Sequence, residues 1–248
     1  MNPSTPQIKI LGIPFSLRSK KETYQTIHSL LQTKRHIRIF TPNPEMLWNA
    51  HRDPVLRRDL LDADLLLPDG MGIILASKIQ GTSLPQRITG IDTREWLLRY
   101  AEKHDLSVFL LGGRQGVADR AKRALTARMP SLRICGTHHG YFDPQKRSPE
   151  NQSVLQAIKA ADPDLLFVCL GSPRQERWIT ENVPSLLHMR LAIGLGGALD
   201  VWSGAVRRAP QAVQRCGMEW LWRALQEPKR IGRLRYLPCF LWKITFHL

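Results

Sequence analysis

The sequence predicts an α/β fold in which crossover helices join the strands of a Rossmann-like parallel sheet. Short apolar runs such as Leu165–Leu170 end at turn-forming residues and are too short for helices, which is typical of buried parallel strands. Segments of helical length separate these runs, and that alternation indicates a parallel sheet. The alternation stops near residue 211. We therefore expect a Rossmann-like domain at 1–210 and a basic, mainly helical C-terminal appendage at 211–248.

Each element follows from its local pattern. Strands are predicted at 8–13, 36–41, 65–67, 107–113, 132–136 and 165–170, the first of them at an edge of the sheet. Helices are predicted at 20–32, 44–61, 94–103, 117–129 and 154–161, and another opens near Gln175. In the appendage, Trp220, Leu221, Trp222 and Leu225 predict a helix that stops near Pro228.

The composition is that of a globular protein with an anionic partner. The chain has 248 residues, 43% of them hydrophobic, and carries a formal net charge of +15. Such a charge indicates a nucleic acid, a nucleotide substrate or an anionic membrane as partner. The four cysteines form no C-x-x-C pair, so no zinc or redox motif is expected, and Cys169 in its apolar run is interpreted as a small buried hydrophobe.

The sequence also predicts the compartment. Residues 1–7 lack the basic and apolar segments of a signal peptide, and no apolar run reaches the ~20 residues that a membrane span needs. We expect a cytoplasmic protein whose contact with the inner face of the cell membrane is peripheral. The sequence leaves the oligomeric state open, and a homo-oligomer is compatible with it.

A series of short motifs runs along most of the chain. In order they are Thr41–Glu45, Ala63–Asp64 leading into Pro68–Gly72, Gly140–Phe142, Gly171–Glu176, Ile193–Asp200, Ser203–Gly204, Arg207–Pro210, Gly217–Arg223 and Glu227–Arg230. Their order and spacing resemble those of the WecG/TagA/CpsF glycosyltransferase family (glycosyltransferase family 26). The resemblance implies an inverting enzyme that moves a hexose from a UDP-sugar to a polyprenyl-diphosphate-linked sugar, for a surface polysaccharide or teichoic acid.

Asp69 is the candidate catalytic base. It ends an apolar strand before Gly70, and ligands of open α/β sheets bind at the carboxyl ends of strands. A carboxylate there can accept a proton, although a turn or helix-cap aspartate explains the same pattern. The resemblance implies that Asp69 deprotonates the acceptor hydroxyl. It likewise implies substrate contacts for Thr41 and Asn43, which local sequence also explains as turn residues beside Pro42 and Pro44.

The resemblance also assigns the donor site. It implies that Tyr141 and Asp200 hold the uracil and that Gln175 contacts the donor or its phosphates. A tyrosine face can stack on a base, and a carboxylate can accept from an imide N–H. The arginines Arg223, Arg230 and Arg233 are implied to bind the diphosphate. Guanidinium groups suit phosphate oxygens, although a solvated basic helix shows the same spacing.

No metal and no cofactor are expected. The sequences Asp62–Asp64 and Asp162–Asp164 match a D-x-D pattern, but both precede their strands and so lie at the wrong end of the sheet. His138 and His139 lack a third ligand. The glycine-rich Gly112–Gly116 lacks the full G-x-G-x-x-G spacing of a dinucleotide loop.

Two alternatives to a glycosyltransferase remain from the residues alone. The charge of +15 suits a nucleic-acid-binding protein, although no nucleic-acid module is recognisable, and the glycine-rich turn suits a nucleotide-dependent oxidoreductase. The last segment, Leu234–Ile244, mixes basic and aromatic residues. This mixture suits the headgroup region of an anionic bilayer, whereas a packed C-terminal helix is the other interpretation.

Overall fold

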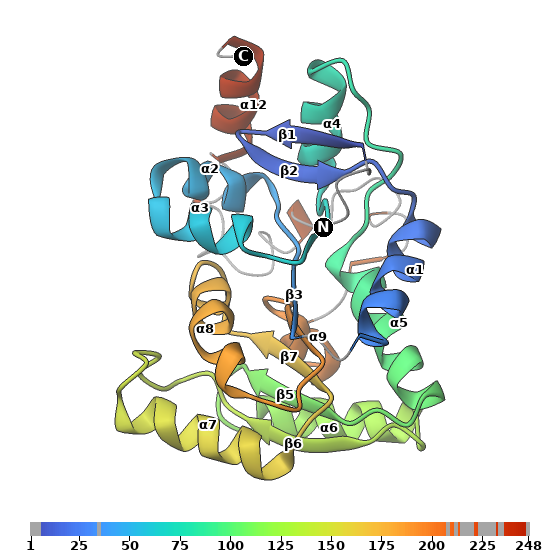
Figure 1. Ribbon diagram of the computed structural model, residues 1–248, viewed down its shortest axis with the longest axis vertical. Helices are drawn as coiled ribbons and strands as arrows, with labels where there is room; N and C mark the ends of the chain where they lie inside the picture. Colours follow the sequence, from blue (N-terminus) through green and yellow to red (C-terminus); the bar gives the residue numbers. More distant parts are fainter. Residues whose placement is uncertain are drawn as a thin grey trace.

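The computed structural model describes residues 6–33, 36–206, 209–210, 213, 221–222, 232 and 236–246. Its centre is a six-stranded sheet in the order β4-β3-β8-β7-β5-β6, in which every neighbouring pair is parallel (Figure 1). The strands are β3 (Ile37–Phe40), β4 (Leu65–Leu66), β5 (Val108–Gly112), β6 (Ile134–His138), β7 (Leu165–Cys169) and β8 (Leu191–Gly194). The predicted Rossmann-like parallel sheet is therefore confirmed.

Helices cover both faces of this sheet. One face carries α2 (Pro44–Arg52), α3 (Pro54–Leu61), α4 (Met71–Ile79), α7 (Pro149–Ala161), α8 (Arg174–Asn182) and α12 (Tyr236–Phe246). The other carries α1 (Lys20–Leu31), α5 (Gly90–Lys103), α6 (Val117–Arg128) and α9 (Ala198–Trp202). A short 3-10 helix, η1 (Val183–Ser185), follows α8.

Side-chain alternation along each strand supplies the two cores. In β7, Leu165, Phe167 and Cys169 face one core, whereas Leu166 and Val168 face the other. All five residues are buried, which is why this strand is a continuous apolar run. Cys169 is 6% exposed, and burial raises the pKa of its thiol to about 12, so it packs as the predicted small hydrophobe.

The predicted edge strand at 8–13 is wrong. The chain instead forms a separate two-stranded antiparallel sheet from β1 (Gln7–Ile10) and β2 (Ile13–Ser16). Leu11 and Gly12 both have positive φ, at 48° and 77°, and such a two-residue turn suits a tight hairpin. The hairpin packs over the core beside α4 and α3 rather than extending the main sheet.

The single helix predicted at 44–61 is also wrong. Asp53 lies between two helices, and its side chain accepts hydrogen bonds from the backbone N–H groups of Val55 and Leu56 at the start of α3. Pro54 lacks the N–H that would continue α2, so the chain restarts there. Helix α4 was not predicted. Elsewhere helices α1, α6 and α7 and strands β3, β5, β6 and β7 match their predictions within a few residues.

The appendage ends in a helix. Pro238 lies in the first turn of α12, where a missing N–H is tolerated, so it does not interrupt the helix. Phe240 and Ile244 are buried in the core, and α12 contacts α2 and α4. Of the predicted helix ending near Pro228 only residues 221–222 are described, and the arginines Arg223, Arg230 and Arg233 lie outside the described residues. None of the helices in the described part of the chain is both long and apolar enough to cross a bilayer.

Candidate active site

The predicted site residues line one edge of the sheet. Because all six strands are parallel, their carboxyl ends meet at this edge. Read along the sheet from β4 to β6, the residues that follow the strands are Asp69, then Thr41 and Asn43, then Asp200, Gln175 and Tyr141. Five gaps of about 4.8 Å put about 24 Å between the two ends of this row. We call these residues the strand-end row.

Asp69 and Thr41 face the same small space. A Cβ built on Gly90 would lie 3.5 Å from Thr41 Oγ1 and 3.7 Å from Asp69 Oδ2. Gly90 is the first residue of α5, a 14-residue helix, and the positive end of a helix dipole stabilises a nearby negative charge. The Asp69 backbone N–H donates to Pro42 O at 3.0 Å, which ties the two strand ends together. A carboxylate and a hydroxyl therefore converge where Gly90 leaves room.

Asn43 lies beside this space but is engaged in structure. Its Oδ1 accepts from Met46 N at 2.9 Å, so the side chain caps α2. A Cβ on Gly70 would lie 4.0 Å from Asn43 Cβ, which places Asn43 against the turn that carries Asp69. In this arrangement the Asn43 amide N–H₂ group is the part of the side chain suited to donate to a ligand.

Gln175 joins β7 to β8 in the middle of the row. It is 3% exposed, its Oε1 accepts from Gly196 N at 2.9 Å, and its Nε2 donates to Glu176 Oε1 at 2.7 Å. A Cβ on Gly194 would lie 2.8 Å from Gln175 Nε2, and Thr41 Oγ1 donates to Gly194 O at 3.4 Å. Gln175 thus holds the loop after β8 against Thr41. Its predicted contact with the donor stays a prediction.

Glu176 is a buried residue beside Gln175 that was not predicted as a site residue. It is fully buried, and burial raises the pKa of its carboxyl, with a smaller rise from the buried Asp59 carboxyl. Hydrogen bonds from Gln175 and Ser172 act in the opposite direction. The signal in the sequence was an acidic residue at the start of a helix that follows a buried strand. Its position fixes the Gln175 amide and, through it, the loop after β8.

The other end of the row is built on glycines. Cβ atoms on Gly112 and Gly140 would approach Cys169 O to 2.3 Å and Gly112 Cα to 3.0 Å, so only glycines allow these strand ends to pack. Gly140 N donates to Gly113 O at 2.8 Å, which holds the β6 loop against β5. The following residue, Tyr141, is 68% exposed. Its ring is therefore free of the core at this end of the row.

Arg174 lies against the loop that carries Tyr141, and Asp200 lies on a helix that packs near Gly113. The Arg174 guanidinium donates to Phe142 O and lies 5.2 Å from the centroid of the Phe142 ring, so it braces the loop that carries Tyr141. Asp200 is on α9 next to Leu199, whose Cβ lies 3.8 Å from a Cβ built on Gly113. Gly140 and Leu199, the residues that precede Tyr141 and Asp200, thus both approach Gly113.

The helices that follow the neighbouring strands β5 and β7 pack on opposite faces of the sheet. Residues of α6 pack in one core and residues of α8 in the other. Open α/β sheets bind ligands where neighbouring strands send their helices to opposite faces. The glycine-rich turn after β5 and the turn after β7 therefore flank the position where a nucleotide is expected.

The acidic D-x-D segments serve structure. Asp64 accepts from Arg38 N at 3.0 Å and Asp164 accepts from Ser107 N at 2.9 Å, so both fix the amino ends of strands, as the sequence indicated. His138 Nδ1 lies 2.8 Å from His139 O. Within the described ranges, no three His, Cys, Asp or Glu side chains are grouped so that they could hold a metal ion.

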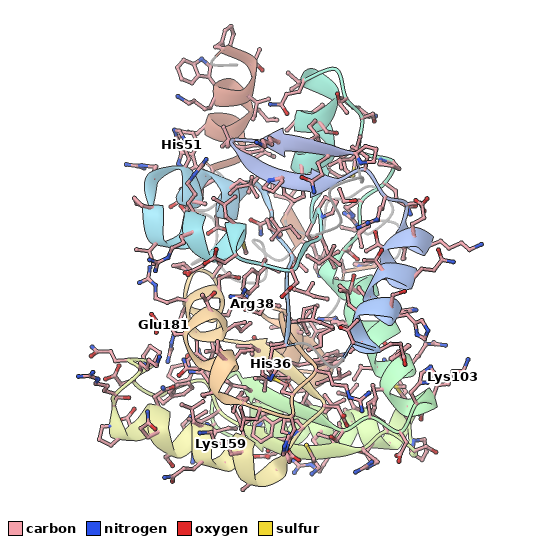
Figure 2. The ribbon with its side chains drawn as sticks, viewed as in Figure 1. His36, Arg38, His51, Lys103, Lys159 and Glu181 are labelled. Carbon is pink, nitrogen blue, oxygen red and sulfur yellow. The ribbon has the colours of Figure 1, made fainter. Side chains whose placement is uncertain are left out.

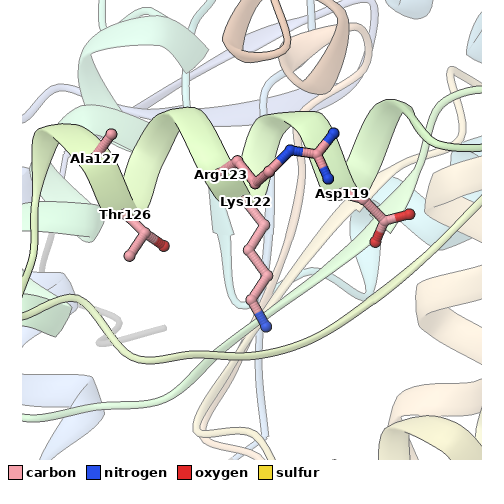
Figure 3. A pocket seen from close by; sticks show the side chains of 5 residues that line it. All are labelled: Asp119, Lys122, Arg123, Thr126 and Ala127. Atoms are coloured by element: carbon pink, nitrogen blue, oxygen red, sulfur yellow. The ribbon is translucent and has the colours of Figure 1, made fainter.

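Two surface hollows lie away from the strand-end row. Figure 3 shows one of about 560 Å³ on the exposed side of α6, lined by Asp119, Lys122, Arg123, Thr126 and Ala127. The other, of about 890 Å³, runs between α1 and α5 beside the stacked rings of Tyr24 and Trp96. Neither is lined by a predicted site residue.

The strand-end row has a carboxylate, Asp69, at one end, a second carboxylate, Asp200, near its middle, and an exposed aromatic ring, Tyr141, at the other end. Residues 8–248 match the model of the Glycosyl transferase WecG/TagA/CpsF family. The chain belongs to this family. Family membership makes the protein a glycosyltransferase, which confirms the predicted family and enzyme class and favours that function over the nucleic-acid-binding and oxidoreductase alternatives.

Relatives of known name support the same class. The chain is 33% identical over 244 residues to the "N-acetylglucosaminyldiphosphoundecaprenol N-acetyl-beta-D-mannosaminyltransferase" of Staphylococcus aureus strain MW2. The matched region covers 98% of this chain and 93% of that protein. The proteins of the same name from strains NCTC 8325 / PS 47 and COL match with the same identity and coverage. The WecG/TagA/CpsF relationship therefore spans the sheet and the appendage together.

Proposed function

We propose that this glycosyltransferase moves N-acetylmannosamine from its UDP derivative to a sugar linked to a polyprenyl diphosphate. The main support for the proposal is that Asp69 and Thr41 both face the space beside Gly90. The donor sugar and the acceptor class follow the printed name of the Staphylococcus aureus relatives. The uronic acid of N-acetylmannosamine and glucose are the other donors that the family resemblance implies.

In the proposed reaction Asp69 is the general base. Its carboxylate takes the proton of the acceptor hydroxyl while that oxygen bonds to the anomeric carbon of the donor. The bond from this carbon to the phosphate oxygen breaks, and UDP leaves with the electron pair. A single displacement inverts the anomeric centre, so an α-linked donor gives a β-linked product, in line with the "beta" of the relatives' name. Thr41 and Asn43 orient the acceptor sugar beside Asp69.

The donor occupies the rest of the row in this proposal. Tyr141 stacks on the uracil and Asp200 accepts from its imide N–H. Gln175 follows β7 and lies between these two residues in the row, and its amide holds the loop after β8 in position. The charge on the leaving diphosphate is balanced by Arg223, Arg230 and Arg233, which requires no divalent metal. These arginines lie outside the described residues, so their role rests on the family resemblance.

A peripheral position at the cell membrane completes the proposal. Trp242 and Phe246 of α12 are 56% and 68% exposed, and they lie one helical turn apart on the side opposite the buried Phe240 and Ile244. Aromatic side chains of this kind enter the interface of a bilayer while lysines such as Lys243 remain at the headgroups. A lipid-linked acceptor would be met at that surface.

The decisive experiment replaces Asp69 by asparagine, which keeps the shape of the side chain and removes its basicity. With UDP-N-acetylmannosamine and a soluble diphosphate-linked N-acetylglucosamine acceptor, turnover is expected to fall about 10²–10⁴-fold, as is typical when a general base is lost. Binding of UDP should stay within twofold, roughly, since the base lies at the far end of the row. Asp62→Asn, an exposed aspartate at the end of α3, is the matched control. Near-normal turnover of Asp69→Asn would overturn the assignment.

A further inference from the structure

Four elements gather at one end of the molecule, and their only charged residues are lysines. Figure 1 shows β1, β2, α4 and α12 at this end, and α4 contacts both β1 and α12. Lys9, Lys78 and Lys243 are the charged residues of these four elements, which contain no carboxylate. The labelled Lys103 and Lys159 in Figure 2 lie toward the opposite end. A partner for this end of the molecule would be anionic.

Helix α4 is apolar on both of its sides. Ile73, Ile74 and Ala76 are buried in the core. Met71, Leu75 and Ile79 are spaced four residues apart, so they form one stripe along the helix, and they are 46%, 45% and 39% exposed. A surface helix of a globular protein ordinarily places polar residues on its outer side. An apolar stripe that remains exposed indicates an interaction site.

Helix α4, which carries the stripe, contacts α12, which carries the exposed aromatic residues. The two helices pack at their starts, because a Cβ on Gly72 would come within 2.7 Å of Leu237 Cδ1. Trp242 and Phe246 of α12 have ring centroids 5.9 Å apart. Two contacting helices thus each expose apolar side chains and each carry one lysine, Lys78 or Lys243.

We infer that Met71, Leu75 and Ile79 of α4 dock the protein on an anionic bilayer together with α12. The inference extends the membrane contact of the proposed function to a second helix. Anionic headgroups complement the lysines, and the apolar side chains enter the interface beneath them. A second copy of this chain fits less well, because a two-fold contact would bring lysines against lysines.

Docking through α4 has a consequence for the site. Met71 follows Asp69 by two residues, and Gly70 between them has a φ of 88° that starts the helix sharply. The stripe and the proposed base therefore belong to one continuous segment. A bilayer in contact with α4 would fix the height of Asp69 above the headgroups, where the diphosphate and first sugar of a lipid-linked acceptor lie.

The test uses the full chain and a double variant, Leu75→Ser with Ile79→Ser. Co-flotation is measured with vesicles of phosphatidylcholine and phosphatidylglycerol. The partition coefficient is expected to fall about tenfold, because two apolar side chains no longer enter the interface. Leu187→Ser is the matched control. Leu187 is 77% exposed and precedes β8, at the sheet edge opposite the strand-end row, so binding should be unchanged. Equal thermal unfolding temperatures show that the variants fold.

Two results would overturn the inference. One is unchanged vesicle binding by the α4 variant while Trp242→Ser with Phe246→Ser loses binding, which would leave docking to α12 alone. The other is a dimer of the parental protein that dissociates in the α4 variant, which would make the stripe an interface between copies. Turnover with a short soluble acceptor separates this inference from the proposed function. Vesicle binding through α4 without sugar transfer would overturn the function and support the docking surface.

Discussion

Gly90→Ala should make the protein more stable and less active. The added Cβ would lie 3.5 Å from Thr41 Oγ1, 3.6 Å from Thr41 Cγ2 and 3.7 Å from Asp69 Oδ2. These are ordinary van der Waals distances, so the native fold accommodates the methyl group. Gly90 is not among the residues with positive φ, so alanine can adopt its conformation. Glycine is thus not required here by the backbone.

The magnitudes follow from this geometry. Replacing glycine by alanine at a compatible position stabilises a protein by about 0.4–1 kcal/mol, chiefly by restricting the unfolded chain. For a chain of this size we expect the unfolding temperature to rise by about 1–4 °C. The methyl group fills the space between the hydroxyl and the carboxylate, where the acceptor must place its own hydroxyl. A displacement of about 1 Å costs on the order of 10²-fold in rate, so turnover should fall by about 10–100-fold.

The assay combines calorimetry with steady-state kinetics on a soluble acceptor. UDP affinity should stay unchanged, since the substitution is at the Asp69 end of the row. Arg99→Ala, on the exposed side of the same helix, should alter neither the unfolding temperature by more than about 1 °C nor turnover. Normal turnover by Gly90→Ala would refute the reasoning that acceptor space is needed there. A lower unfolding temperature would refute the claim that the backbone does not need glycine.

Three further outcomes are expected. Tyr141→Ala should raise the Kd for UDP roughly 10–100-fold, since stacking on a base contributes about 1–3 kcal/mol, whereas Tyr141→Phe keeps the ring and should bind normally. Activity should survive excess EDTA, and a loss that Mn²⁺ restores would show that a metal is needed. Burial raises the pKa of Glu176, so the native state holds its proton above pH 4.5 more firmly than the unfolded chain does. Stability should then fall as the pH rises through that window, and Glu176→Gln should flatten the fall in urea titrations; an unchanged slope would contradict the burial argument.

The appendage calls for point variants rather than deletion. Truncation after Leu234 would be the simplest test of the bilayer contact if the segment were only an appended helix. Phe240 and Ile244 are 0% and 2% exposed, so deletion of α12 would open the core and lower stability as well. Replacement of the exposed Trp242 and Phe246 by serine leaves the buried side in place. Arg230→Ala, assayed with a soluble acceptor, then tests the diphosphate role separately.

The parallel sheet could be predicted because its strands are buried on both faces. Leu165–Cys169 and Val108–Gly112 are continuous apolar runs, and among the described elements no other of five residues has that character. The predicted strand at 8–13 and the predicted single helix at 44–61 were wrong because a turn interrupts each of these segments. Leu11 adopts a positive φ that its side chain gives no reason to expect, so the hairpin was missed. At Asp53–Pro54 the proline was present, but its effect on the helix was overlooked.

The site was predictable only in part, for a similar reason. Asp69 and Thr41 could be found because each closely follows a strand, whereas Tyr141 was assigned through the family resemblance. Gly90 and Glu176 act through neighbours that are distant in sequence, and only the folded chain shows them. Gly90 leaves space beside Thr41 and Asp69. Glu176 accepts a hydrogen bond from Gln175, which in turn accepts one from the backbone of Gly196. Helix α4 was missed because its outer side is as apolar as its inner side, so it lacks the amphipathic period of a surface helix.

The position of β8 bears on how the protein is made. This strand pairs with β3 on one side and with β7 on the other, and β3 and β7 do not pair with each other. During synthesis both of these strands leave the ribosome before Leu191–Gly194 does. Until then the half that carries Asp69 and the half that carries Tyr141 each present an open strand edge, which is a hazard for aggregation. Among the strands in the described part of the chain, the last to be synthesised is therefore the one that joins these two halves, and the proposed site is incomplete until it is in place.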